Sequence, residues 1–232
     1  MMRYDYNCFL TDLLLTLKLA LKTTLKMTSS KLQFKAEKMK SINKATLFQL
    51  SKELKELNQK SGSQFDRCLT LARVKISKVI VDDNLVDLYE ILVVDCEVLH
   101  SKIHQLQLSP GDENITKIVR KLMYVNSYVN IKEFKKLVTI LAHKYGKDFY
   151  EDAINNPDDM NLVKKCQNDN VDQLVESYLK EICDCYKIDL YGETQKNNTT
   201  ATEDASPIRA QRSEPASELD DLKQRFDALK KK

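Results

Sequence analysis

The sequence predicts an all-α protein: a long antiparallel helical hairpin, several shorter packed helices, a flexible linker and a C-terminal docking helix. Only four glycines and four prolines occur in 232 residues, and tryptophan is absent. This composition favours helices and leaves few strand signals. Apolar residues recur at helical spacing over residues 10–57 and again over residues 65–106. Because one short break joins these stretches, the two helices are expected to lie antiparallel.

The first predicted helix covers residues 10–57, preceded by an irregular lead-in at residues 1–9. Its apolar side chains follow one another at a mean spacing close to 3.6 residues. At 1.5 Å per residue it would be about 70 Å long. Residues 8–21 are apolar, but Asp12 and Lys18 interrupt them and no small-residue cleavage site follows. We therefore interpret this run as core helix and not as a signal peptide or a membrane span.

The remaining core helices are marked by turn and capping residues. Ser61-Gly62-Ser63 separates the two long helices. The segment 109–112 predicts a helix with Pro110 at its first position, and Asn130 with Glu133 predicts the start of the next. Gly146 stands where a C-terminal cap belongs. Two further starts are expected at residues 156–159 and at Asn170.

The predicted domains are a helical core at residues 10–192, a disordered linker at 193–216 and a terminal helix at 217–232. Ile208 is the one bulky apolar residue of the linker, so this segment cannot bury enough surface to fold. The six cysteines lack the spacing of a disulfide framework, and we expect them to be reduced.

Positive charge is concentrated in the first 60 residues, which hold eleven lysines and one arginine against five acids. Two interpretations remain open: a solvated helix face, or a contact with anionic membrane or an acidic partner. Few aromatic residues stand among these lysines as stacking platforms, so nucleic acid is not an expected partner. The candidate basic face consists of Lys18, Lys22, Lys26, Lys35, Lys38 and Lys44.

Residues 217–232 form a self-contained helix signal. Ser217 can cap the N-terminus together with Asp220, and acids in the first turn and lysines in the last complement the helix dipole. Leucines and Phe226 make one apolar stripe at helical spacing. A helix this short is marginal alone in water, so we expect it to form against a groove. That groove belongs either to a partner or to the chain's own core.

The order Leu222-x-x-Arg225-Phe226-x-x-Leu229-Lys230 resembles the type-one MIT-interacting motif, whose pattern is acidic-x-x-Leu-x-x-Arg-Leu-x-x-Leu-Lys. Phe226 replaces the second leucine, and Leu219 stands where an acid is expected. The resemblance implies that six side chains bind a three-helix MIT domain. These are Leu219, Leu222, Arg225, Phe226, Leu229 and Lys230.

Three core segments have distinctive residue patterns. They are Leu-Ala-Arg-Val-Lys-Ile at 71–76 leading to Asp-Asp-Asn at 82–84, Leu-Ala-x-Lys-Tyr-Gly-Lys-Asp-Phe at 141–149, and Leu-Val-x-x-Tyr-Leu-x-Glu-Ile at 174–182. Together they resemble the increased-sodium-tolerance (Ist) family of ESCRT-III-like proteins. The core signature carried over to this chain comprises Arg73, Asn84, Tyr89, Glu90, Lys144, Tyr145 and Gly146.

The resemblance implies an ESCRT-III-like fold and an adaptor that regulates multivesicular-body sorting. Its implied partners are the MIT domain of the AAA ATPase that disassembles ESCRT-III, and an ESCRT-III-like subunit of the charged multivesicular body protein type. The implied location is cytoplasmic, peripheral on the endosomal membrane. The alternative is a polymer subunit that remodels membranes through its lysine-rich first helix.

Other chemistry has little support, and we expect no enzyme, cofactor or metal. His100 and His104 have zinc-ligand spacing, but no third ligand is evident. The sequence has no Gly-rich phosphate loop and no nucleophile elbow. We interpret the polar run of Tyr89, Glu90, Asp95 and Glu97 as a solvated helix face. An unrecognised enzyme would instead need a concave pocket with strongly shifted titrating groups.

Overall fold

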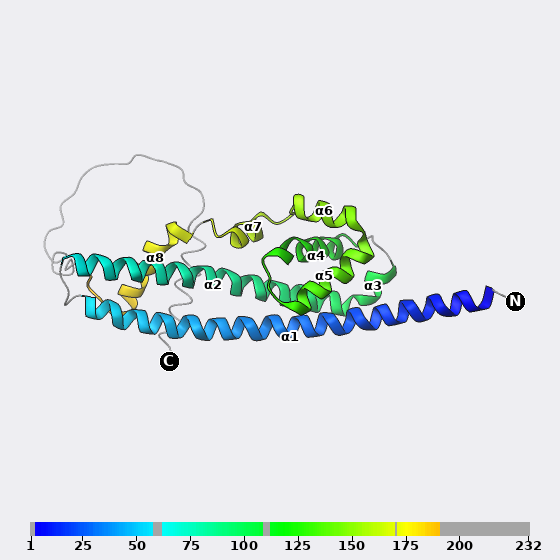
Figure 1. The fold of residues 1–232 in the computed structure, drawn as a ribbon, viewed down its shortest axis with the longest axis horizontal. Helices are drawn as coiled ribbons and strands as arrows, with labels where there is room; N and C mark the ends of the chain where they lie inside the picture. Colours follow the sequence, from blue (N-terminus) through cyan, green and yellow to red (C-terminus); the bar gives the residue numbers. More distant parts are fainter. Residues whose placement is uncertain (1–2, 58–61, 109–111, 170, 191–232) are drawn as a thin grey trace, which may run out of the picture. The chain divides into compact units, whose positions relative to one another are not determined.

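The computed structural model describes residues 3–57, 62–108, 112–169 and 171–190, and every regular element in these ranges is helical. The predicted all-α fold is confirmed (Figure 1). The elements are α1 (Arg3–Leu57), α2 (Ser63–Ser101), α3 (Ile103–Leu108), α4 (Glu113–Tyr124), the short 3₁₀ helix η1 (Val125–Ser127), α5 (Lys132–Tyr145), α6 (Lys147–Asn155), α7 (Met160–Gln167) and α8 (Val171–Tyr186).

The chain divides into two compact units. The first comprises residues 1–41 and 82–169, and the second comprises residues 42–81 and 170–232. Both long helices contribute a segment to each unit. The linker at 193–216, the terminal helix at 217–232 and the cap at Asn170 lie outside the described residues.

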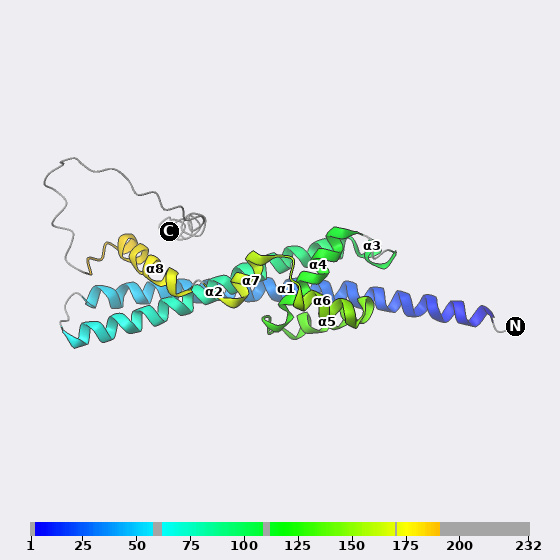
Figure 2. The ribbon, with the colours of Figure 1, turned by 90° about the horizontal axis from the view of Figure 1, so that it is seen from above.

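In the first unit, α1 and α2 run antiparallel. Ser29 of α1 donates a hydrogen bond to Glu97 of α2 at 2.6 Å. Lys40, which comes later in α1, pairs through its ammonium with Glu90, which comes earlier in α2. The views in Figures 1 and 2 show α4, α5 and α6 beside this pair. The core of the unit joins all these helices, with Leu25, Leu92 and Phe134 completely buried.

In the second unit, the end of α1, the start of α2 and α8 share one apolar core. Leu54, Ile76 and Ile182 are completely buried there. The ammonium of Lys75 lies 2.6 Å from the carboxylate of Glu53, which connects the two long helices. The helix α8 ends in a left-handed turn at Lys187, where the Ile188 amide donates to the Cys183 carbonyl at 2.8 Å.

The lead-in expected at residues 1–9 is wrong for residues 3–9, because α1 already begins at Arg3. No glycine or proline occurs in that segment, so no residue there breaks the helix. The second periodic stretch is also divided, since Lys102 separates α2 from α3. The core pattern continues across this division, and Ile103 and Leu106 remain buried.

Two of the expected helix starts differ from the structure. The Asp112 carboxylate accepts a hydrogen bond from the Asn114 amide and caps α4, so Pro110 is not the first helical residue. Asn130 does not cap α5, whose N-cap is Ile131 in an extended conformation. The two oxygens of Asn130 instead accept hydrogen bonds from Lys35 and Lys135. The start at residues 156–159 is confirmed, with Asp159 as the cap of α7.

Candidate interaction surfaces

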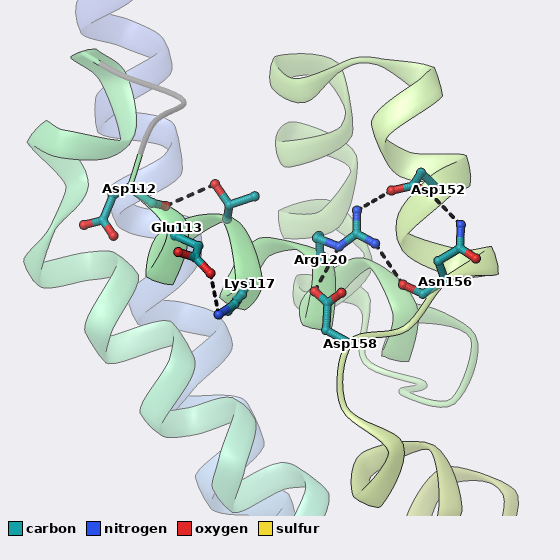
Figure 3. A network of polar contacts seen from close by, with 8 residues as sticks. Asp112, Glu113, Lys117, Arg120, Asp152, Asn156 and Asp158 are labelled. Carbon is teal, nitrogen blue, oxygen red and sulfur yellow. Dashed lines mark hydrogen bonds and ion pairs between the residues drawn. The ribbon is translucent and has the colours of Figure 1, made fainter.

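Arg120 of α4 holds α6 and the following loop (Figure 3). Its guanidinium donates to Asp152, to Asp158 at 3.0 Å and to the Asn156 carbonyl at 2.8 Å, while its side chain is 16% exposed. The ring of Phe149 lies 5.8 Å from the guanidinium carbon. The pKa of Asp152 is below its usual value because Arg120 and Asn156 donate hydrogen bonds to it. Sequence reasoning missed this cluster, because the partners of Arg120 are 32 to 38 residues away from it in sequence.

A surface pocket of about 380 Å³ lies between η1, α5 and α6, in the first unit. Val138 and Ala142 supply its apolar lining, and Thr139, His143 and Lys147 are exposed residues on its wall. The side-chain amide of Asn126 donates to the Tyr150 hydroxyl at 3.4 Å. The oxygen of the same amide, Asn126 Oδ1, is buried and accepts no hydrogen bond from any described residue.

The signature segment at 141–149 forms one wall of this pocket. Gly146 ends α5 and precedes α6 at φ 92° and ψ 166°, a backbone conformation essentially confined to glycine. The expected cap is confirmed, since the Gly146 amide donates to the Ala142 carbonyl at 2.9 Å. The rings of Tyr145 and Phe149 lie 4.9 Å apart across this joint. Lys144 is exposed, with its ammonium 5.9 Å from the Tyr145 ring, and partial burial lowers its pKa.

The other signature residues stabilise packing contacts. Asn84 donates to the Asn168 side chain at 3.1 Å, and Asn168 has a left-handed conformation at the end of α7. Glu90 pairs with Lys40 on the surface of the first unit. In the second unit, Arg73 of α2 pairs with Glu176 of α8 at 2.6 Å. These residues therefore do not converge on one site.

The solvated-face interpretation of α2 is wrong for two residues. Tyr89 and Asp95 are buried, and burial raises the pKa of both. Lys121 of α4 lies 3.1 Å from the Asp95 carboxylate and opposes that rise. Glu90 and Glu97 are exposed, in agreement with the interpretation. Helical spacing did not reveal this burial, because α4 covers a face of α2 that carries polar residues.

The candidate basic residues do not form one uniform face. Lys22, Lys26 and Lys38 are exposed in the first unit, and Lys44 is exposed in the second. The ammonium of Lys18 lies 2.9 Å from the His104 ring nitrogen Nδ1, and that of Lys35 donates to the Asn130 carbonyl at 3.2 Å. These two lysines are half-buried.

Large apolar side chains also face solvent on α1 in the first unit. Leu19, Met27 and Phe34 are 66%, 52% and 62% exposed. Their spacing of eight and seven residues places them on one side of the helix, opposite its buried leucines. Lys22 and Lys26 project on one side of this row, and Lys31 and Lys38 project on the other. Sequence analysis missed this row because its residues stand between the core positions.

All six residues of the terminal motif lie outside the described residues. The described part of the chain holds no group of three or more His, Cys, Asp or Glu side chains suited to a metal ion. None of the helices in the described ranges combines the length and apolarity needed to cross a membrane.

Comparison with known proteins gives consistent matches. A family model described as "Ist1: Regulator of Vps4 activity in the MVB pathway" matches residues 22–189. The "Vacuolar protein sorting-associated protein IST1" of Saccharomyces cerevisiae is 28% identical over 214 residues, which are 87% of this chain and 67% of that protein. An "IST1-like protein" of Dictyostelium discoideum is 25% identical over 134 residues, which are 57% of this chain but 34% of that protein.

A solved structure is also similar. It is the N-terminal domain of S. cerevisiae Ist1 in complex with the Did2 MIM motif, with a TM-score of 0.61 and 27% identity. The match covers 79% of this chain and 98% of the yeast domain. The family model thus spans α1 from residue 22 onward and all of the elements from α2 to α8, in agreement with the fold. From this evidence, the chain belongs to the Ist1 family of regulators of Vps4 activity in the MVB pathway.

Proposed function

We propose that this protein is an ESCRT-III-associated adaptor that makes two contacts. Its C-terminal helix binds the MIT domain of Vps4, the ATPase that disassembles ESCRT-III, and its helical core binds an ESCRT-III-like subunit. It acts in the cytoplasm, at the surface of the endosomal membrane. The observation that carries this proposal is the family match over residues 22–189, since the family is described as regulating Vps4. The yeast domain in complex with a Did2 MIM motif supports the second contact.

The contact with Vps4 rests on the sequence of residues 217–232. The apolar stripe enters a groove of the MIT domain, and Arg225 pairs with an acid on that domain. Binding orders a short helix that is marginal by itself, which lowers the affinity of one tail for one domain. A dissociation constant on the order of micromolar is expected for a single contact.

The tail contact is tested by measuring binding of the full chain to an isolated MIT domain. Leu222→Asp and Leu229→Asp should each abolish binding, because each places a charge in the apolar stripe. Gln224→Asp is the matched control, since it adds the same charge on the opposite side of the helix. Unchanged affinity in both leucine variants would refute the contact.

A second candidate function is direct membrane binding by α1, which the exposed row of Leu19, Met27 and Phe34 favours. Apolar side chains flanked by lysines on both sides are typical of a helix lying on an anionic lipid surface. Sedimentation with vesicles containing phosphatidylserine tests it. Lipid binding should fall steeply between low and high salt, and Phe34→Ser should weaken it at both. The control is Val94→Ser, which removes an exposed apolar side chain from α2 in the same unit.

A further inference from the structure

Lysines of two helices come together where the start of α5 lies against α1, in the first unit. Those of α1 follow one another at spacings of four and three residues, so they project from one side of that helix. Those of α5 stand at its beginning, and α5 lies alongside α1 in both views (Figures 1 and 2). We call this set the α1–α5 lysine cluster; it comprises Lys31, Lys35, Lys38, Lys132, Lys135 and Lys136.

Asn130 joins the two sides of the cluster. The ammonium of Lys35 donates to its backbone carbonyl at 3.2 Å, and the ammonium of Lys135 donates to its side-chain oxygen at 3.3 Å. Lys35 belongs to α1 and Lys135 to α5, so ammonium groups of two helices meet at one neutral residue. An ammonium binds a charged oxygen more strongly than a neutral one, because Coulomb attraction adds to the hydrogen bond. An anionic oxygen at this point would therefore be a better acceptor than Asn130.

The positive charge of the cluster is not neutralised within the described residues. None of its lysines forms an ion pair with a described carboxylate. The acids nearest in sequence are Glu37, which accepts a hydrogen bond from Gln33 at 3.3 Å, and Glu133, which is half-buried. Ammonium groups held close together without acids repel one another, and a bound anion relieves that repulsion.

We propose that the α1–α5 lysine cluster binds a ligand that carries several phosphate groups on one small ring, as in an inositol polyphosphate or the headgroup of a phosphoinositide lipid. One phosphate bridges Lys35 and Lys135 beside Asn130, and further phosphates contact the lysines on either side. Lys31 and Lys38 are separated by about 10 Å along α1. A single phosphate cannot span this distance, whereas a ring with phosphates at several positions can. This inference goes beyond the proposed function and does not depend on it.

The site is tested by isothermal titration calorimetry of the full chain with inositol hexakisphosphate. Lys35→Gln with Lys135→Gln should weaken binding by about tenfold or more, because both charges are removed while each amide can still donate to Asn130. Lys35→Arg with Lys135→Arg keeps the charges and should keep most of the affinity. The matched control is Lys164→Gln with Lys180→Gln, which removes the same charge from two exposed lysines outside the cluster.

Sedimentation with vesicles distinguishes the two sources of the phosphates. Vesicles containing phosphatidylinositol 4,5-bisphosphate are compared with vesicles that contain phosphatidylserine at the same total charge. Stronger binding to the first kind, lost in the double glutamine variant of Lys35 and Lys135, identifies the lipid headgroup as the ligand. Equal binding to both kinds, together with binding of inositol hexakisphosphate at the cluster, identifies a soluble inositol polyphosphate.

The calorimetry decides whether the site exists. A loss of affinity confined to the glutamine variant of Lys35 and Lys135 supports it. Equal affinity of all variants, equal weakening in that variant and the control, or absence of binding to the wild-type chain overturns it. None of these results bears on the contact with an MIT domain, which is measured with a different partner. Thermal unfolding of each variant excludes a loss of folding as the cause.

Discussion

Arg120 shows how one side chain can connect three segments. Its donors reach α6, the loop after it and, through Asp158, the approach to α7. A planar guanidinium with five donors can make all of these contacts at once, whereas a lysine ammonium cannot match this geometry. The stability of α6 on α4 should therefore depend on Arg120 in particular.

We expect Arg120→Ala to lower the free energy of unfolding by about 1 kcal/mol, because the mostly covered Arg120 side chain loses its packing and its three hydrogen bonds to exposed acceptors together. Arg120→Lys should recover only part of this loss. Urea unfolding followed by circular dichroism measures both variants. Lys117→Ala is the control, since Lys117 is on the same helix and its ion pair, with Glu113, is exposed. Equal stability of Arg120→Ala and the wild type would contradict this assignment.

The stability of the Arg120→Ala variant should depend on pH differently from that of the wild type. Arg120 keeps the pKa of Asp152 below its usual value, so the folded state favours the ionised carboxylate. This contribution is complete above the unfolded pKa of about 4 and is lost as the pH falls through the lower folded pKa. The difference in stability between the wild type and Arg120→Ala should therefore shrink from pH 7 to pH 3. An unchanged difference would mean that Asp152 contributes nothing to it.

At the scale of elements, the joint at Gly146 sets where α5 ends and α6 begins. A Cβ at this position would meet no atom within 4 Å, so the requirement for glycine comes from the backbone alone. The conformation at φ 92° and ψ 166° is unfavourable for every residue with a side chain. Gly146 also lines the pocket, so the same requirement fixes the backbone of one of its walls.

We expect Gly146→Ala to destabilise the protein by about 1–3 kcal/mol. Gly146→Asn should be no better, because asparagine tolerates the left-handed helical region and this ψ lies outside it. Thermal or urea unfolding of the two variants measures the effect. Recovery of stability by asparagine, or wild-type stability of the alanine variant, would show that the joint relaxes to an ordinary conformation.

Prediction of elements succeeded where the signal is local. The start of α7 at Asp159 and the end of α5 at Gly146 follow from residues within one or two turns of the boundary. The start of α5 was wrong by one residue, because the side-chain oxygen of Asn130, which was expected to cap the helix, accepts a hydrogen bond from the Lys135 ammonium. A capping pattern considers only backbone amides as donors to that oxygen, so it does not include this competing side chain.

At the scale of the whole molecule, the proposed function combines a folded core with a terminal motif. One tail on one MIT domain makes few contacts, so its affinity is expected to be modest. Several chains assembled side by side would present many tails, and each further contact would then be intramolecular. Because each single contact is weak, MIT domains should bind assembled chains in preference to single chains.

We expect the full chain at low surface density to bind a soluble MIT domain with a dissociation constant on the order of micromolar. Dense immobilisation of MIT domains and clustering of the chain should strengthen apparent binding at least tenfold. Surface plasmon resonance at several densities measures this. A chain ending at Gly192 is the control and should bind at no density. Tight binding by the single, unclustered chain would contradict a role for avidity.

The amino-acid sequence alone determined the helical class, the two long antiparallel helices and the position of the turn between them, because periodicity of 3.6 residues and scarcity of glycine and proline act within a few residues. Only the tertiary structure decided which polar residues are buried, which lysines have partners and where a pocket remains. Asp95 is buried by α4, and Lys18 and Lys35 are engaged by distant segments. These outcomes depend on how faces pack over long sequence separations, and no local pattern encodes that packing.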